Sequence, residues 1–524
     1  MDKESVLKEK FVPMFLDRLT SGKIKTRAEL LKSKRDICSE LGIDRIPKNG
    51  EVLSLLSEEY INRFKSVLKS KPVRTASGVS VVALMTKPFD CPHGVCIFCP
   101  GGTRFNTPQS YTGEEPAARR AKFNNYDPYA QIQARLKHYK FLGYAPEKIE
   151  TIIIGGTFTT LPKEYRDGFI TRIYKALNDF PNVKNTESDL MTEEKKNETA
   201  GIRCVALAIE TKPERCDDND IRQLLRYGAT RVEMGMQSVF DDVLFKNNRG
   251  HTIQDVRDST ARLRNNAYKV DHHIMINLPF SDIDKDRETI RQAYNDESLR
   301  PDAIKIYPTL VIKGTALYNM WEKGLYSTYP LEDTIDIVAE AEINAPKWLR
   351  IMRVERDIPS TMIQGGIRIT NFRQLVFDRI KSLGKSPNDI RSREIGHIKI
   401  TKSPIISLKR ETYRAAGGDE VFLSIEDEAN LGIIGFLRFR ITDCSDVGLI
   451  RELHVYGIQA PISYEEKESF QHKGYGKSLL EEAESIARHE YNLKKIKIIS
   501  GVGVREYYKK NGYHLENSYM VKDL

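Results

Sequence analysis

Apolar runs and amphipathic stretches alternate along the middle of the chain. Apolar runs of four to eight residues are typical of buried strands, whereas apolar residues that recur every three or four positions are typical of helices. The runs predict six strands, at residues 79–85, 149–154, 203–209, 231–236, 270–278 and 303–307. The stretches between them predict helices at 127–142, 163–177, 218–227, 252–265 and 284–295. Such alternation is typical of a parallel sheet, so we expect an α/β fold with a partial (β/α)6 barrel over residues 76–330.

The segments on either side of this domain have other patterns. Residues 1–75 repeat apolar residues at helical spacing and predict a helical N-terminal segment. The polar stretch 182–199 predicts an exposed loop, and the Arg-rich stretch 331–400 predicts a basic helical linker. After residue 400 the pattern changes to short strands, followed by a glycine loop, a helix, a strand and a short helix. We therefore expect a second α/β domain over 401–524.

Positive charge is concentrated in two segments. The 524 residues carry a net charge of +9, but residues 1–75 contain 17 Lys and Arg against 11 Asp and Glu, and residues 345–415 contain 16 against 6. Clustered basic residues are typical of a surface that follows a phosphate backbone, with a solvated lysine-rich face as the alternative. No apolar run approaches the ~20 residues of a membrane span, and the charged N-terminus does not resemble a signal peptide. We therefore expect a cytoplasmic protein with no membrane partner.

Three cysteines lie within nine residues, directly after the first predicted strand. Cys91, Cys96 and Cys99 offer three soft thiolate ligands, which suit an iron–sulfur cluster. Three ligands would leave the fourth iron of a 4Fe–4S cluster open to a substrate or cofactor such as S-adenosylmethionine (SAM). With His93, the same loop could instead hold a structural zinc ion. A disulfide is the third interpretation, and an odd cysteine cluster without a secretion signal argues against it.

Polar and glycine residues follow the next predicted strands. In parallel sheets, ligands bind at the carboxyl ends of the strands. Paired glycines allow a ligand to approach the backbone, and buried carboxylates need a partner such as a ribose hydroxyl. For Glu233 and its neighbour Glu210, a salt bridge to Lys212 or Arg231 is the alternative. The predicted cofactor contacts at these strand ends are Gly155, Gly156, Thr157, Glu210 and Gln237.

A second glycine motif lies near the C-terminus. Gln471-His-Lys-Gly474-Tyr475-Gly476 fits the pattern Q/R-x-x-G-x-G/A and opens a predicted helix at 477–489. The unpaired N–H groups and the dipole of a helix start suit a pyrophosphate. The motif follows a strand at 451–455 and precedes a strand at 494–500, an order that resembles GNAT-type acetyltransferases. A nucleotide loop of another α/β fold is the alternative.

Together, the cysteine loop and the strand-end residues resemble a radical-SAM domain, although that family usually has C-x3-C-x2-C rather than C-x4-C-x2-C. Joined to a GNAT-type module, they closely resemble the catalytic subunit of Elongator, which modifies the wobble uridine of tRNA. The resemblance covers the chain from about residue 70 onward. The matching stretches include Arg74–Gly78, Cys91–Gly102, Gln109–Gly113, Gly155–Phe158, Lys305–Leu310, Arg451–Gly457 and Ser500–Gly503.

The resemblance implies three cofactors and a set of residues for each. Cys91, Cys96 and Cys99 would hold a 4Fe–4S cluster that cleaves SAM. Tyr508 and Lys148 would be catalytic, with Lys148 reaching the acetyl-CoA thioester from the radical-SAM domain. The further acetyl-CoA contacts would be Glu452, Leu453, His454, Val455, Gln471, Gly474, Tyr475, Gly476 and Lys477.

The resemblance also implies a reaction and partners. A radical formed on the acetyl methyl group would add to carbon 5 of the wobble uridine, and loss of the thioester would leave a carboxymethyl group. The partners would be the anticodon stem–loop of tRNA, an electron donor, and either a second copy of the chain or other Elongator-type subunits. We expect the cluster and the thioester pocket to open onto one cavity. A lysine acetyltransferase with a structural iron–sulfur domain and a non-catalytic tRNA-binding subunit are the competing hypotheses.

Overall fold

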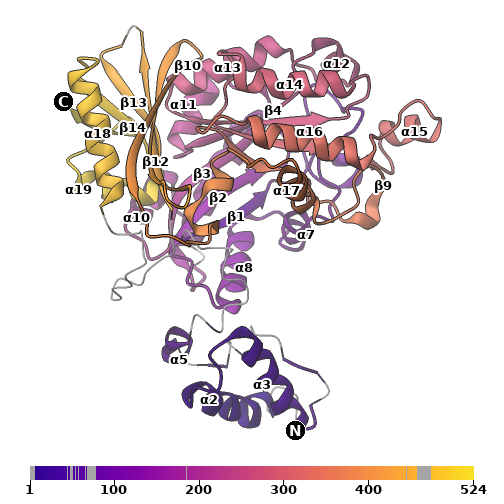
Figure 1. Cartoon of the computed structure of the whole chain (residues 1–524), viewed down its shortest axis with the longest axis vertical. Coiled ribbons are helices and arrows are strands. Elements are labelled where there is room, and N and C mark those ends of the chain that lie inside the picture. Colours follow the sequence, from indigo (N-terminus) through magenta and orange to yellow (C-terminus); the bar gives the residue numbers. More distant parts are fainter. Residues whose placement is uncertain are drawn as a thin grey trace.

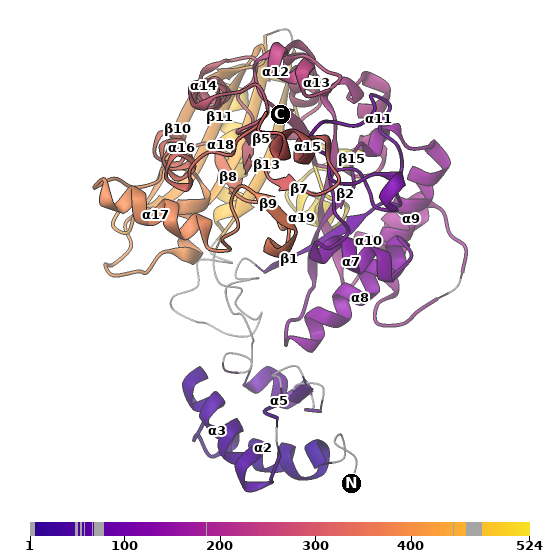
Figure 2. The same cartoon turned by 90° about the vertical axis from the view of Figure 1, so that its right-hand side faces the viewer.

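The computed structural model describes residues 6–43, 45–47, 51–52, 55–56, 58–64, 67, 78–184, 186–443, 445–456 and 474–524. Three parts follow one another along the chain: a group of N-terminal helices, a central parallel sheet with its helices, and a C-terminal sheet (Figures 1 and 2). Among the helices in these ranges, none combines the length and the apolar character needed to cross a bilayer.

The N-terminal helices form a small core of their own. Their described elements are the π-helical turn η1 (Leu7–Phe11), α2 (Val12–Thr20), α3 (Arg27–Glu40) and α5 (Glu58–Arg63). Thr26 caps α3, because its hydroxyl accepts from the backbone N–H of Glu29 while the Glu29 carboxylate accepts from the backbone N–H of Thr26. Phe11, Phe15 and Ile37 are buried in this core. The prediction of a helical N-terminal segment is therefore confirmed for its described residues.

The central sheet contains seven strands in the order β1-β2-β3-β4-β5-β6-β8, and each neighbouring pair is parallel. All six predicted strands and all five predicted helices are present, with bounds that differ by at most two residues from the prediction. The strands are β1 (Val79–Met85), β2 (Lys148–Ile154), β3 (Arg203–Thr211), β4 (Arg231–Gln237), β5 (Lys269–Ile276), β6 (Ala303–Pro308) and β8 (Arg350–Arg353). The predicted helices are α8 (Pro128–Phe141), α9 (Lys163–Asp179), α11 (Asp218–Arg226), α13 (Ile253–Asn265) and α14 (Ile283–Asn295).

Two parts of this domain differ from the prediction. Strand β8 extends the sheet beyond β6 from within the segment that was expected to be only a helical linker. Helix α10 (Leu190–Asn197) lies in the stretch expected to be a loop, because Asp189 caps it and Leu190 and Asn197 are buried. The remaining elements are α7 (Pro116–Phe123), α12 (Asp241–Lys246), β7 (Val311–Ile312), α15 (Ala316–Glu322), α16 (Leu331–Asn344), β9 (Ile363–Gly365) and α17 (Phe372–Ser382).

The C-terminal sheet is mostly antiparallel, in the order β10-β11-β12-β13-β14-β16-β15. Its only described parallel pair is β13 with β14, and that pairing ends at Ile450, so residues Arg451–Val455 of β13 diverge from β14. The elements are β10 (Ile406–Ala415), β11 (Gly418–Asp427), β12 (Gly432–Thr442), β13 (Val447–Val455), α18 (Tyr475–His489), β14 (Lys495–Ile499), α19 (Arg505–Lys510), β15 (His514–Glu516) and β16 (Tyr519–Asp523).

Buried ion pairs join the two sheets. Arg451 of β13 donates to both carboxylate oxygens of Asp302, which precedes β6, at 2.7 Å each. The same guanidinium donates to Glu420 of β11, and all three side chains are 0–1% exposed. Gly501, which precedes α19 of the C-terminal domain, lies so close to the Val205 carbonyl of β3 that a Cβ at this position would overlap the carbonyl oxygen. The barrel and the C-terminal domain are therefore packed as one body along β3 and β6.

Candidate functional site

The three clustered cysteines line one cavity at the carboxyl ends of the central strands. The cavity has a volume of about 260 Å³ and is also lined by residues near the ends of β2, β3, β4 and β5. Burial raises the pKa of Cys91 to about 11, with a further contribution from the neighbouring Cys99 and Cys96. Burial and Cys96 also raise the pKa of Cys99. Buried thiols such as Cys91 and Cys99, whose raised pKa disfavours ionisation, need a positive centre nearby to become thiolates.

Hydrogen-bond donors surround the cysteine sulfurs. Arg249 Nη1 lies 3.3 Å from Cys96 Sγ, and the backbone N–H of Ser110 donates to Cys99 Sγ over 3.2 Å. His93 Nε2 is 3.2 Å from Cys96 Sγ. Burial and the nearby cations lower the pKa of His93 to about 4, so its ring is neutral at physiological pH. Donors of this kind stabilise metal-bound thiolates and tune an iron–sulfur centre.

The zinc alternative requires three thiols and His93 to converge on one ion, and they do not. Among the described residues, the one His/Cys/Asp/Glu group with ligand atoms all within 4.8 Å of one another is Glu210, Glu233 and His273. At that location Lys305 and Arg231 already form ion pairs with Glu233, so positive charge is supplied without a metal. The three sulfurs are spaced more widely than the ligands of a single ion, and this spacing suits a polynuclear cluster. The cysteines in the described ranges are all free thiols.

The turn after β2 has a backbone conformation that favours glycine. Gly155 and Gly156 have φ values of 128° and 105°, which side chains rarely adopt. Gly156 and Thr157 line the cavity, whereas Gly155 packs against Thr86. Among the residues that the structure describes, neither the buried Thr157 hydroxyl nor the buried Gln237 side-chain oxygen has a hydrogen-bond partner. Buried unpaired polar atoms that border a cavity suit a polar ligand such as SAM, which would satisfy them.

Glu210 ends β3 inside the same cavity. The Tyr111 hydroxyl donates to its carboxylate over 3.1 Å. Burial raises the pKa of Glu210 to about 7, against the opposing effect of Lys305. The salt-bridge alternative is wrong for Glu210, because Lys212 pairs with Glu214, but it is right for Glu233, which Arg231 holds at 2.9 Å.

Sequence reasoning left several cavity residues without a role. Of the paired histidines on β5, His273 faces the cavity, whereas His272 is buried against Thr260 on the other face. Successive side chains of a strand point to opposite faces, so only one of two neighbouring residues can point inward. Two of the stretches quoted for the family resemblance, Gln109–Gly113 and Lys305–Leu310, contain most of the others. The unassigned lining residues include Gln109, Tyr111, Lys305, Tyr307, Arg353 and Arg356.

The predicted acetyl-CoA residues meet where β13 diverges from β14. Gly474 has φ 80° and begins α18, so Tyr475, Gly476 and Lys477 form its first turn. A Cβ on Gly476 would lie 2.9 Å from the Tyr507 hydroxyl and 3.7 Å from Val455. The end of β13, the start of α18 and helix α19 therefore converge. Gln471 lies outside the described residues.

The side chains where β13, α18 and α19 converge differ in how far they can contact a ligand. Tyr508 of α19 is 6% exposed, and burial raises its pKa well above the usual range. The His454 ring lies 4.3 Å from that of Tyr456, centroid to centroid. Leu453 is half-buried on the same strand. Glu452 pairs with Lys269 at 2.6 Å and with Arg438 at 2.9 Å, so its side chain anchors β13 to the barrel and its backbone is what remains for a ligand.

Lys148 begins β2, at the opposite end of that strand from the glycine turn. Its register neighbours are Val79 and Arg203. A Cβ on Gly503 of the C-terminal domain would lie 2.6 Å from Arg203 Cβ, so Lys148 lies at the end of the sheet that packs on this domain. The placement agrees with a lysine near both modules, whereas its catalytic role stays a prediction.

The two candidate sites lie at opposite ends of the barrel strands. A seven-residue strand spans ~23 Å. Between the sites, buried Arg231 pairs with Glu150, Glu233 and Asp271 on the concave face of the sheet. Within the described part of the chain, the residues that line the cluster cavity come from the stretch between Ala83 and Ile358 and not from the C-terminal domain. The shared cavity stays a prediction, since residues 457–473, which follow β13, lie outside the described ranges.

Family models match nearly the whole chain. The "ELP3 N-terminal domain" matches residues 10–76, and the "Radical SAM superfamily" matches residues 88–293. The "Radical_SAM C-terminal domain" matches residues 301–382, which include β8, and the "Acetyltransferase (GNAT) family" matches residues 398–513.

Full-length relatives and a solved structure agree with this division. The chain is 43% identical to the "tRNA uridine(34) acetyltransferase" of Methanocaldococcus jannaschii, over 100% of this chain and 99% of the relative. It is 40% identical to the human "Elongator complex protein 3", over 95% of this chain and 93% of the relative. The structure of an N-terminally truncated Elp3 from Methanocaldococcus infernus matches with a TM-score of 0.75 and 39% identity, covering 86% of this chain and 100% of that one.

These matches agree with the geometry of both sites and support the same cofactors: a 4Fe–4S cluster and SAM at the cysteine cavity, and acetyl-CoA at the diverging strand. The chain therefore belongs to the Elp3 family of enzymes, in which a radical-SAM domain is fused to a GNAT-type acetyltransferase domain.

Proposed function

We propose that this enzyme converts the wobble uridine, position 34, of tRNA to 5-carboxymethyluridine, with acetyl-CoA as the source of the two-carbon group. The observation that carries the proposal is the pairing of two intact sites in one chain: a three-cysteine cavity with unpaired polar atoms, and a diverging strand that faces a helix start. The relative named "tRNA uridine(34) acetyltransferase" supports the substrate. A lysine acetyltransferase would need only the second of these sites.

Each group of residues has a stated task in this reaction. When bound, the cluster and SAM supply a hydrogen-abstracting radical, and acetyl-CoA supplies the methyl carbon. Cys91, Cys96 and Cys99 would hold the cluster, while Thr157 and Gln237 would hydrogen-bond SAM through the atoms that have no protein partner. Because the cavity is largely buried, these polar groups act at low dielectric, where each hydrogen bond to a ligand is stronger than in water.

The groove of the C-terminal domain would bind and orient the thioester. Within the described ranges, the backbone of β13 beyond Ile450 has no strand partner on the β14 side, so its N–H and C=O groups would be available to the amides of pantetheine. The first turn of α18 presents N–H groups to the pyrophosphate. Tyr508 would lie next to the thioester and donate its hydroxyl proton in a hydrogen bond, because its raised pKa keeps it protonated.

The substrate would be held by basic surfaces. The segment 345–415, which includes β8 and α17, carries 16 Lys and Arg against 6 Asp and Glu. Phosphate contacts from such a segment, together with those of the N-terminal helices, would give tRNA binding a steep salt dependence. The electron donor and any second copy or further subunit stay predictions.

The test is anaerobic turnover of the reconstituted protein with SAM, acetyl-CoA and tRNA. Mass spectrometry of the digested tRNA should show 5-carboxymethyluridine, and 5′-deoxyadenosine should form in parallel. The Cys99→Ala variant should lose both products, while Cys204→Ala, a matched change at a buried cysteine of β3 outside the cavity, should retain them. Acetylation of lysine that survives Cys99→Ala, with no change in tRNA, would instead establish the lysine acetyltransferase.

A further inference from the structure

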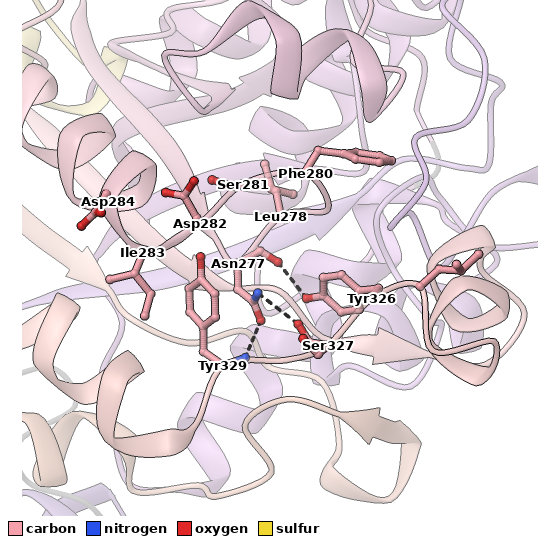
Figure 3. Close-up of a pocket in the computed structure, with 11 residues that line it drawn as sticks. Asn277, Leu278, Phe280, Ser281, Asp282, Ile283, Asp284, Tyr326, Ser327 and Tyr329 are labelled. Carbon is pink, nitrogen blue, oxygen red and sulfur yellow. Dashed lines mark hydrogen bonds between the residues drawn. The ribbon is translucent and has the colours of Figure 1, made fainter.

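Another cavity lies outside the cysteine site, between the loop after β5 and the segment that follows α15 (Figure 3). Its volume is about 470 Å³, which is within the usual range of small-molecule sites in proteins. Asn277 joins the two segments, because its side-chain oxygen accepts from the Tyr329 N–H at 2.8 Å and its carbonyl accepts from the Tyr326 hydroxyl at 2.7 Å. The cavity between the segments is therefore preformed.

Aromatic and aliphatic side chains line much of this cavity. Tyr326 and Tyr329 are half-buried, whereas Phe280 and Leu325 are 48% and 70% exposed. The ammonium group of Lys246 lies 5.4 Å from the centroid of the Phe280 ring, so one aromatic ring at this location already binds a cation. Rings and aliphatic groups of this kind suit a ligand that combines apolar segments with positive charge.

A buried carboxylate lies directly behind the lining residues. Asp286 of α14 is 2% exposed and accepts from the hydroxyls of Ser281 and Tyr329 and from the Asn277 N–H. Burial raises the pKa of Asp286 to about 6, so the group is mostly ionised at neutral pH. In the part of the chain that the structure describes, no lysine or arginine pairs with it, although buried charges usually have a partner. Burial, and then the charges of Asp286 and Asp282, raise the pKa of Tyr329, so both charges act at the cavity.

Two further acids line the cavity itself. Asp282 and Asp284 are exposed, and neither forms an ion pair with another residue of the described ranges. Lys285, which lies between them in the sequence and Asp286, pairs instead with Asp242 at 3.1 Å. The exposed Lys323, at the end of α15, is not a lining residue. Because the lining contains acids and no lysine or arginine, the cavity attracts cations.

The spacing of the acids favours an extended cation over a metal ion. Among the described residues, the one group of three or more His, Cys, Asp or Glu ligands within 4.8 Å of one another is Glu210, Glu233 and His273, in the cysteine cavity. The three aspartates at positions 282, 284 and 286 are therefore too far apart to bind a single ion together. A flexible chain that carries several ammonium groups can contact them separately.

We propose that this cavity binds a linear polyamine of the spermidine type. Its ammonium groups would pair with Asp282 and Asp284. Its methylene segments would pack against Leu325 and the rings of Tyr326 and Tyr329. The inference is independent of the proposed function, because this cavity shares no lining residue with the cysteine site.

Isothermal titration calorimetry of the full chain with spermidine, in the absence of tRNA, tests the proposal. We expect one saturable site per chain, and weaker binding of putrescine, which has one ammonium group fewer. The double variant Asp282→Asn with Asp284→Asn should bind spermidine about tenfold more weakly, since each exposed ion pair contributes up to about fivefold in affinity. Asparagine preserves the N-cap of α14, where Asp282 accepts from the Lys285 N–H, so the helix is retained.

Two controls separate this site from a general attraction of polyamines to acidic surfaces. Asp217→Asn with Asp218→Asn makes a matched change at the exposed start of α11, outside the cavity, and should leave the affinity unchanged. Leu325→Ser removes an apolar contact without a change of charge and should also weaken spermidine binding.

Four outcomes would overturn the proposal. They are the absence of saturable binding, equal weakening in the two double variants, competition by Mg²⁺ at the same concentration as spermidine, and tighter binding of a lysine-rich peptide than of spermidine at this cavity. The third would assign the cavity to a metal ion, and the fourth would assign it to a protein partner. Because no arm of the test measures turnover, a failure of the proposed function would leave these outcomes unaffected.

Discussion

Replacing Asp302 by asparagine tests the ion pairs that join the barrel to the C-terminal domain. Asp302 is fully buried, and its two oxygens accept from both Arg451 nitrogens, while Oδ2 also accepts from the Val270 N–H at 2.9 Å. Although burial alone would raise its pKa, the charges of Arg264 and Arg451 hold that pKa well below the usual range. In Asp302→Asn, whichever way the amide is turned, its NH2 group faces a donor. The variant therefore loses a charge and gains a repulsive contact.

Breaking a buried ion pair of this kind costs about 3–5 kcal/mol. We take about 3 kcal/mol, because Glu420 still accepts from Arg451. With an unfolding entropy of about 2.1 cal/mol/K per residue, the 524 residues give about 1.1 kcal/mol/K, so the melting midpoint should fall by about 3 °C. Because Arg451 precedes the predicted acetyl-CoA contacts of β13, the KM for acetyl-CoA should also rise.

The matched control is Asp443→Asn, which removes the same group from an exposed pair with Arg414. That carboxylate is 63% exposed and accepts at 2.9 and 3.0 Å. An exposed pair contributes at most about 1 kcal/mol, so calorimetry should show a shift below about 1 °C. Equal shifts in Asp302→Asn and Asp443→Asn would refute the reasoning, since the argument depends on burial rather than on the presence of an ion pair.

Three further predictions concern the two sites and their junction. Glu210→Gln should flatten the pH dependence of stability between about pH 5 and pH 7: the carboxyl pKa rises from 4.5 to about 7 on folding, so the folded state binds more protons and the wild type loses stability as pH rises across this window. Thermal melts of both proteins at several pH values check this, and parallel curves would contradict it. Gly501→Ala should lower the melting midpoint by about 1–3 °C, because its Cβ meets the rigid backbone of Val205, whereas Gly384→Ala, where a Cβ meets nothing within 4 Å, should lose only the cost of its positive φ. Tyr508→Phe should reduce acetyl-CoA hydrolysis about tenfold while 5′-deoxyadenosine formation from SAM persists, and an equal loss of both activities would argue against a role confined to the thioester.

The strands and helices of the barrel could be predicted because each has a clear period. The run of β2 ends in three consecutive isoleucines, 152–154, and the helices between the strands repeat apolar residues every three or four positions. Strand β8 could not be recognised, since its four residues Arg350–Arg353 include two arginines and only Ile351 is buried. Strand β10 gives a weak signal for a similar reason: it is an edge strand, half of its ten residues are exposed, and only Ala415 is buried.

The candidate site was predictable where chemistry depends on residue type and spacing. Three cysteines on one loop and two glycines after a strand indicate their roles without coordinates. Pairings between distant segments carry no such signal. The sequence does not reveal that Arg231 forms an ion pair with Glu233, nor that Glu210 accepts a hydrogen bond from Tyr111. These pairings depend on the distances that side chains span across three strands. The ion pair between Glu452 and Lys269 likewise joins residues that are 183 positions apart in the sequence.

Buried Glu233, which pairs with Arg231 and Lys305, gives the cluster cavity a charged floor, and a cavity that is closed at one end fixes the order in which molecules bind. Any molecule that needs the deepest position must arrive first and depart last, because larger molecules that follow it cover the route by which it came. The kinetics of this enzyme should therefore follow an ordered rather than a random mechanism, in which the nucleic acid is the last reactant to bind and the first product to leave.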